Sequence, residues 1–183
     1  MRRWVTSFSL LLLLVPSGGT AQERLTQDEA LRLAFPAPAI IERRTAYLGE
    51  SDVNLARGLA GEEVEITQRV VTYYVGRREE SPVGVAYFDS HRVRSKHEVA
   101  MIVVGVDGLV RQVEILRFDE PPEYRATDPW LDQLTGEQLA PSLSLKGGII
   151  NLTGATLTSR ALVRATRRAL ALHQVIRPFG SAR

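Results

Sequence analysis

The chain has 183 residues, of which 44% are apolar and 24% charged, a balance that excludes a disordered or fibrous protein. The 23 Lys and Arg residues exceed the 21 Asp and Glu residues by two, an excess that Arg2 and Arg3 account for, so the charge gives no support to a nucleic-acid-binding surface. The chain contains no Cys, which excludes disulfides, thiolate metal sites and cysteine nucleophiles.

Residues 1–21 have the pattern of a secretory signal peptide. Arg2 and Arg3 precede a short apolar stretch from Phe8 to Val15, and small residues follow up to Gly19-Thr20-Ala21. This order of charge, apolar run and small-residue cleavage site is typical of export. We therefore expect a protein of the periplasm or of the outer face of the cytoplasmic membrane. An uncleaved N-terminal anchor is the alternative interpretation of the same segment.

Residues 22–62 are expected to form an N-terminal helix and an irregular lead-in. Thr26 and Glu29 stand at capping-box spacing before an apolar pattern, which predicts a short helix that ends before Pro36. The stretch from Ala37 to Gly61 shows no clear periodicity.

Residues 63–183 carry the pattern of a small sheet and are expected to form the main domain. Asp107-Gly108 separates the last two of four predicted strands and favours a two-residue hairpin turn. The predicted strands, rich in β-branched and aromatic residues, are Val64–Val75, Val83–Phe88, Glu98–Val106 and Leu109–Phe118.

The chain after these strands is expected to end in a long helix. A proline-rich loop contains one predicted helical turn at Trp130–Leu134, and an extended piece follows at Ile149–Leu152. From Thr158 to Val175 apolar residues recur every three or four positions, which predicts an amphipathic helix. The fold class predicted from these elements is α+β: a single domain with an antiparallel sheet and flanking helices.

Four hydroxyl residues cluster in the segment 153–159, where the extended piece enters the last helix. Its sequence is Thr153-Gly154-Ala155-Thr156-Leu157-Thr158-Ser159. Free N–H groups and the positive end of the helix dipole favour a phosphate at such a position, and Gly154 allows close approach. Ordinary capping of the helix by Thr158 or Ser159 explains the same residues without a ligand, and composition alone favours that interpretation.

This segment resembles the flavinylation motif of the FMN-binding domain family. The family includes exported flavin subunits of the sodium-pumping NADH:quinone oxidoreductase and of Rnf-type complexes. The resemblance implies that FMN, installed from FAD by a magnesium-dependent flavin transferase, is joined by a phosphoester to Thr156, with Thr158 as the second choice. It implies cofactor contacts from Thr153, Gly154, Ala155, Thr156, Leu157, Thr158 and Ser159.

Two further features bear on this resemblance. The family usually has an acidic residue where this chain has Ile150, beside Asn151, which makes the covalent link a weaker implication than FMN binding. The run from Arg117 to Tyr124 looks like the family's Glu-x-Pro turn beside the flavin ring. The resemblance therefore assigns Glu120 and Pro122 to the cofactor site, and a proline-stiffened loop with solvated acids is the alternative.

The remaining polar clusters in the sequence give weaker indications of function. The basic run from His91 to His97 is interpreted as a strand connection with a solvated face, or else as a site for an acidic partner or the flavin phosphate. We expect no metal site, no catalytic residues and no nicotinamide-binding fingerprint.

The resulting hypothesis is an exported flavoprotein that carries electrons on FMN and is not an autonomous enzyme. The expected partners are the flavin transferase and membrane or periplasmic redox proteins, such as cytochromes, quinone-linked complexes and other flavin domains. A flavin-free exported binding or adaptor module is the alternative.

Overall fold

Five consecutive strands form one antiparallel sheet. The computed structural model describes residues 25–180, and within that range the strand order is β1-β2-β3-β4-β5, each strand paired antiparallel with the next. The predicted α+β class with a single domain is confirmed. The strands are β1 (Ile40–Tyr47), β2 (Val70–Arg78), β3 (Ser81–Arg92), β4 (His97–Gly105) and β5 (Val110–Phe118).

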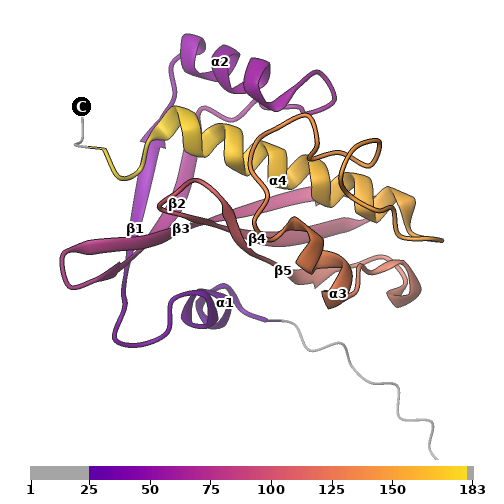
Figure 1. The fold of residues 1–183 in the computed structure, drawn as a ribbon, viewed down its shortest axis with the longest axis horizontal. Helices are drawn as coiled ribbons and strands as arrows, with labels where there is room; N and C mark the ends of the chain where they lie inside the picture. The colour runs from indigo at the N-terminus through magenta and orange to yellow at the C-terminus, as the bar shows by residue number, and fades with distance from the viewer. Residues whose placement is uncertain (1–24, 181–183) are drawn as a thin grey trace, which may run out of the picture.

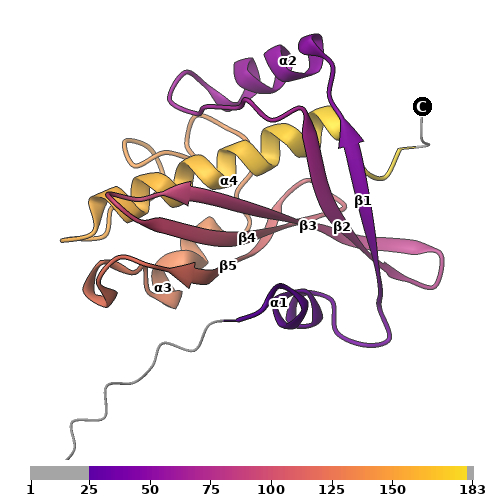
Figure 2. The ribbon, with the colours of Figure 1, turned by 180° about the vertical axis from the view of Figure 1, so that it is seen from behind.

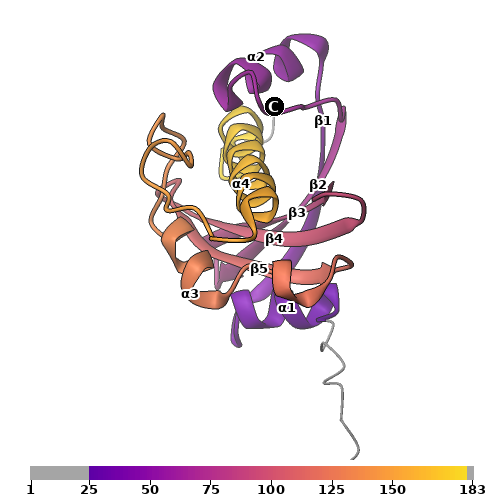
Figure 3. The ribbon, with the colours of Figure 1, turned by 90° about the vertical axis from the view of Figure 1, so that its right-hand side faces the viewer.

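Helices cover both faces of the sheet (Figures 1 and 2). The long helix α4 (Thr156–Ile176) lies along one face with α2 (Glu50–Ala60) beyond it, and α1 (Gln27–Ala34) lies on the opposite face (Figure 3). A short helix, α3 (Asp128–Leu131), stands beside β5 between the 3₁₀ turns Pro122–Tyr124 and Asp132–Leu134. None of the helices in the described range has the length and apolar character needed to span a bilayer.

The main core lies between α4 and the sheet. The apolar stripe predicted for the last helix is confirmed there: Leu162, Ala165 and Ala169 are at most 2% exposed. They pack with alternate residues of the central strands, including Val85 and Ile102. This packing fixes the position of the first turn of α4 relative to β3 and β4.

The second face of the sheet is closed by α1 and the residue that follows it. The predicted capping box is present, with the Thr26 hydroxyl accepting from the Glu29 N–H and the Glu29 carboxylate accepting from the Thr26 N–H. Phe35 packs directly over Gly76 of β2 and approaches Gly84 of β3. A Cβ atom at Gly76 would collide with the Phe35 ring, so glycine is required there.

The stretch from Ala37 to Gly61, for which the sequence predicted no regular structure, contains β1 and α2. The signal for α2 exists, because Val53, Ala56 and Ala60 recur at helical spacing and are all buried. The signal for β1 is weaker because it is an edge strand with mostly exposed side chains.

The predicted strand at Val64–Val75 was wrong in its first half. Strand β2 begins only at Val70. Arginine side chains satisfy the preceding carbonyls: Arg57 Nε donates to the Ile66 carbonyl at 2.6 Å, and Arg168 Nε donates to that of Glu65 at 2.9 Å. Backbone groups that are satisfied in this way need no strand partner.

Two other predicted elements differ in detail. The β4–β5 connection, residues 106–109, contains a bond from the Gly105 N–H to the Leu109 carbonyl, and Gly108 has a φ of 79°. It replaces the predicted two-residue turn. The extended piece at 149–152 is irregular, because the Ile150 carbonyl and N–H are bound by the side chains of Trp130 and Gln133. The predicted signal peptide, residues 1–21, lies outside the described range.

Candidate functional site

The hydroxyl-rich segment forms an uncapped helix N-terminus. Gly154 has a φ of 84°, a left-handed conformation that favours glycine, and open space surrounds the position of a Cβ atom there. Ala155 precedes the first residue of α4, and no side chain caps that end. The first-turn N–H groups and the positive end of the helix dipole are therefore available to an anion.

The hydroxyls of the first turn of α4 fall into two classes. Thr158 is 1% exposed and donates to the Tyr124 carbonyl at 2.6 Å. Ser159 is fully buried, donates to the Ala155 carbonyl at 3.2 Å and accepts from the Leu152 N–H at 3.1 Å. The hydroxyls of Thr158 and Ser159 therefore stabilise the fold by hydrogen bonds to the backbone. Thr156 is half-buried, and its hydroxyl has no hydrogen-bond acceptor among residues 25–180.

Asn151 contacts the Thr156 hydroxyl directly. Its Nδ2 donates to Thr156 Oγ1 at 2.8 Å, which orients the hydroxyl oxygen. Ile150, at the position where an acid was expected by resemblance, is 74% exposed. An amide cannot take up the hydroxyl proton as a carboxylate can, so this side of the site provides orientation without a base.

A small pocket lies at the N-terminus of α4. Its volume is about 190 Å³, and it lies between the β3–β4 turn and the segment 154–158. The predicted residues Glu120, Gly154, Ala155, Thr156, Leu157 and Thr158 line it, together with Val93, Arg94 and Tyr124.

The other predicted residues lie outside this small pocket. Thr153 is exposed in the preceding turn, Ser159 is buried behind it, and Pro122 is exposed at the start of its 3₁₀ turn. Two aromatic residues flank the predicted Glu-x-Pro turn. Phe118 is buried in the main core, and Tyr124 lines the small pocket.

Glu120 builds a wall of the small pocket by closing the β3–β4 turn. Its Oε1 accepts from the N–H groups of Ser95 at 2.6 Å and Lys96 at 2.7 Å, and from that of Arg94 at 3.3 Å. These backbone bonds hold the pKa of Glu120 below its usual range. The Glu120 carboxylate therefore stabilises the β3–β4 turn, residues 93–96, which contains most of the basic run from His91 to His97.

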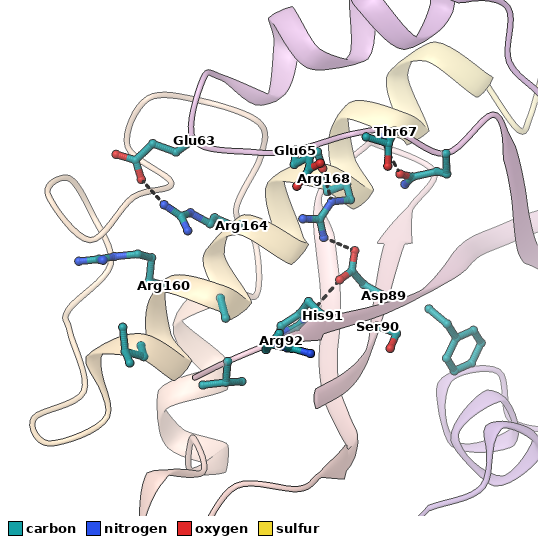
Figure 4. A pocket seen from close by; sticks show the side chains of 15 residues that line it. Glu63, Glu65, Thr67, Asp89, Ser90, His91, Arg92, Arg160, Arg164 and Arg168 are labelled. Atoms are coloured by element: carbon teal, nitrogen blue, oxygen red, sulfur yellow. Dashed lines mark hydrogen bonds and ion pairs between the residues drawn. The ribbon is translucent and has the colours of Figure 1, made fainter. Parts of the chain in front are cut away.

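A larger pocket of about 630 Å³ adjoins the small one (Figure 4). It lies between β3, α4 and the segment 63–68, and we call it the arginine pocket. Arg160, Arg164 and Arg168 follow one another at four-residue spacing along the helix face that lines it. Val93 and Leu157 line both pockets.

A chain of charged groups forms the floor of the arginine pocket. Arg168 is 2.5 Å from Asp89 Oδ2, Asp89 Oδ1 is 2.9 Å from His91 Nδ1, and His91 Nε2 is 2.8 Å from Glu98 Oε2. Glu98 is fully buried, and its other carboxylate oxygen has no hydrogen-bond partner within residues 25–180. The chain joins α4 to β3 and β4.

The charge states in this chain follow from burial and pairing. Burial acts to lower the pKa of His91, but bonds to Asp89 and Glu98 outweigh it and raise the pKa to about 9. Burial acts to raise the pKa of Asp89, yet His91 and Arg168 bring it below its usual range. Burial dominates at Glu98 and raises its pKa. His91 is therefore a cation at neutral pH.

Sequence reasoning missed this chain of charges. It depends on the register that pairs His91 with Glu98 and on Arg168 of α4, which is 79 residues from Asp89 along the chain. Within residues 25–180, no group of three or more His, Asp or Glu side chains is arranged to hold a metal ion.

The comparison with known families is consistent with the position of the site. Residues 95–171 match the family model described as FMN-binding domain. The match runs from the β3–β4 turn through β4, β5 and the hydroxyl segment into α4. No curated protein matches the chain.

Proposed function

We propose that this chain is an exported flavoprotein that holds FMN through a phosphoester at Thr156 and carries electrons between redox proteins, because residues 95–171 match the model of the FMN-binding domain family. The observation that supports the covalent link is the Thr156 hydroxyl, which has no acceptor among residues 25–180 and lies at an uncapped helix N-terminus inside the matched region.

The residues around Thr156 fit the phosphate end of FMN. The uncapped first turn of α4 offers N–H groups and a positive dipole to the phosphate, and Gly154 leaves room beside it. Leu157 and Tyr124 offer apolar surface next to the phosphate position. Bound FMN supplies the electron-accepting ring, and the protein positions it and controls access.

Attachment requires a single group transfer. Thr156 Oγ1 attacks the FMN phosphorus of FAD, an O–P bond forms, the pyrophosphate bond breaks, and AMP leaves. The hydroxyl proton passes to a base of the flavin transferase, because Asn151 can only donate to the oxygen. The role of the chain is to present an oriented hydroxyl at an electropositive helix end.

The proposed function includes export from the cytoplasm and electron exchange with redox partners. Residues 1–21 provide the export signal, and the covalent link would keep the cofactor from being lost outside the cytoplasm. Electrons would pass to and from cytochromes, quinone-linked complexes or other flavin domains.

The decisive experiment is co-expression of the full chain with a flavin transferase. We expect flavin fluorescence that remains with the protein in a denaturing gel and a mass increase equal to one FMN. Thr156→Val should remove nearly all of it, while the matched control Thr153→Val, at an exposed position, should keep it. Absence of flavin from the unmodified chain would favour the flavin-free adaptor, and retention in Thr156→Val would contradict the assigned residue.

The contact with Asn151 gives a second test. Asn151→Ala removes the bond that orients the hydroxyl and should slow loading by about tenfold, the equivalent of one hydrogen bond. Ile150→Asp supplies a carboxylate beside the site and should speed loading. Unchanged rates in both variants would leave orientation and proton removal entirely to the transferase.

The role of carrier is tested with the loaded protein. Dithionite should bleach the flavin band, and a cytochrome or small acceptor should restore it. NADH should leave the band unchanged in stopped-flow mixing, because the sequence has no nicotinamide-binding fingerprint. Saturable bleaching by NADH within seconds would make the protein a reductase.

A further inference from the structure

Strand β3 extends beyond its pairing with β2. The register of β2 on β3 ends with Tyr73 opposite Tyr87, whereas β3 continues and remains paired with β4 as far as Arg92. The residues from Phe88 to Arg92, which we call the open edge, therefore have a strand neighbour on one side only. In an antiparallel ladder, alternate residues direct their N–H and C=O groups away from a given neighbour. The open edge thus offers backbone groups for which residues 25–180 supply no strand partner.

The arginine pocket lies against the open edge. All the consecutive residues 88–93 line this pocket. Side chains along a strand alternate between the two faces of a sheet, so consecutive residues line one cavity where that cavity borders the edge of the strand. The segment 63–68 forms the opposite wall, and in the described range it makes no hydrogen bond between backbone groups to the open edge. Its carbonyls at Glu65 and Ile66 accept from arginine side chains instead.

Helix α4 runs along the floor of the arginine pocket, antiparallel to the open edge (Figure 4). Asp89 contacts Arg168 at one end of the pocket. Val93, four residues further along β3, lines the pocket together with Leu157, eleven residues back along α4. Four strand residues span about 14 Å and eleven helical residues about 17 Å, so the two elements remain side by side. A strand added at the open edge would therefore lie along α4.

The charge of the arginine pocket favours an acidic occupant. Four arginines and the charged His91 line it, against three carboxylates. Arg160 projects from the helix without an ion-pair partner among the described residues, while Arg164 is 3.2 Å from the exposed Glu63 (Figure 4). Arg160 and Arg164 are about 6 Å apart along the helix axis, and alternate residues of a strand are about 7 Å apart. Acidic side chains at every second position of an added strand therefore match the spacing of these two arginines.

We propose that the open edge of β3 binds an extended, acidic segment of a partner protein as an additional strand, with carboxylates at alternate positions directed at Arg160 and Arg164. The bound backbone pairs with β3 on the side that β2 leaves free. Main-chain hydrogen bonds supply affinity, and the arginines supply specificity for acidic sequences. The site is separate from Thr156, so it can be tested on the full chain without flavin, and failure of flavin attachment would leave the tests below unaffected.

The mode of binding is tested with short, fluorescently labelled peptides and the unloaded full chain. The first peptide alternates glutamate with threonine, and fluorescence anisotropy at low salt should show saturable binding. Replacing every glutamate by glutamine should weaken binding by about tenfold. Two further peptides keep all the glutamates but carry methyl groups on alternate backbone nitrogens, in one register or the other. One of these two should bind about tenfold more weakly, because a bound strand donates those N–H groups to β3. Unchanged binding of both methylated peptides would overturn strand addition.

The location of binding is tested with two double variants and by hydrogen exchange. Arg160→Gln, Arg164→Gln should weaken binding of the glutamate peptide by about tenfold. Arg111→Gln, Lys146→Gln removes the same charge outside the arginine pocket and should leave binding nearly unchanged. In the unmodified chain the peptide should protect amides of the open edge from exchange. Equal losses in the two double variants, protection confined to the β3–β4 turn, or no binding at all would overturn the proposal.

Discussion

Two histidines lie at neighbouring contacts between α4 and β3, and the fold keeps one of them charged and the other neutral. His91, linked through Asp89 to Arg168, has a pKa of about 9. His173, near the C-terminal end of α4, lies against the Tyr87 hydroxyl and the Phe179 ring, and burial lowers its pKa to about 4. The same helix and strand are thus joined by a charged contact between Arg168 and Asp89 and, five residues further along α4, by a buried contact between His173 and Tyr87. Positive charge is therefore kept at the arginine pocket, which His91 lines and His173 does not.

Removing the charged contact between Asp89 and Arg168 should lower the free energy of unfolding by the largest amount. Asp89→Asn leaves His91 and Arg168 without their shared partner in a mostly buried site, at a cost of about 3–5 kcal/mol in unfolding free energy. Glu63→Gln, which removes an exposed partner of Arg164, should cost less than about 1 kcal/mol. Urea denaturation at pH 7 measures both. Equal losses would show that the chain of charges adds no more than a surface pair.

Raising the pH should selectively weaken the charged contact, in which His91 takes part. The folded pKa of His91, about 9, is above its ordinary value of 6.5, so its contribution is complete below pH 6.5 and is lost as the pH rises through 9. The loss is on the order of 3 kcal/mol. Urea denaturation at pH 6.5 and 9 should show this fall in the unmodified chain and a much flatter profile in His91→Gln. A fall of the same size in that variant would assign the effect to other groups.

Lowering the pH should weaken the buried contact at His173, with a loss of unfolding free energy of the same order. The folded pKa of His173, about 4, is below its ordinary value of 6.5, so its contribution is complete above pH 6.5 and is lost as the pH falls through 4. The loss is again on the order of 3 kcal/mol. His173→Gln should flatten the acid side of the stability profile and leave the alkaline side as it is. A change on the alkaline side of the stability profile in His173→Gln would mean that the two contacts are coupled through α4.

The smallest effect is expected from the second hydroxyl of the motif. Thr158→Val removes the bond to the Tyr124 carbonyl at a buried position and should cost about 1–2 kcal/mol of unfolding free energy. Flavin loading should remain close to that of the unmodified chain, in contrast to Thr156→Val. Loss of loading with unchanged stability would move the attachment site to Thr158.

Local signals in the sequence predicted the parts of the fold that depend on neighbours along the chain. The capping box at Thr26, the strands after 80 and the apolar stripe of α4 all follow from short-range periodicity. The first-turn hydroxyls could be grouped from sequence, but their division into structural and free groups could not. That division depends on the Tyr124 carbonyl, which lies 34 residues from Thr158 along the chain.

Long-range contacts account for what the sequence did not predict. The segment at 64–68 has the composition of a strand, and only the packing of Arg57 and Arg168 against its carbonyls explains why it is not one. The basic run from His91 was interpreted as a solvated connection. Its first residue instead lies in a mostly buried chain of charges, because strand pairing places Glu98 opposite it.

The Thr156 hydroxyl, the proposed acceptor, lies on α4, after the five strands of the described range. A polypeptide released before residue 156 would lack the acceptor, and one released within α4 would lack part of the helix face that docks on the sheet. Incomplete products of synthesis would then be poor substrates for flavin attachment. A covalently attached cofactor would then mark molecules in which α4 has been made and has docked on the sheet.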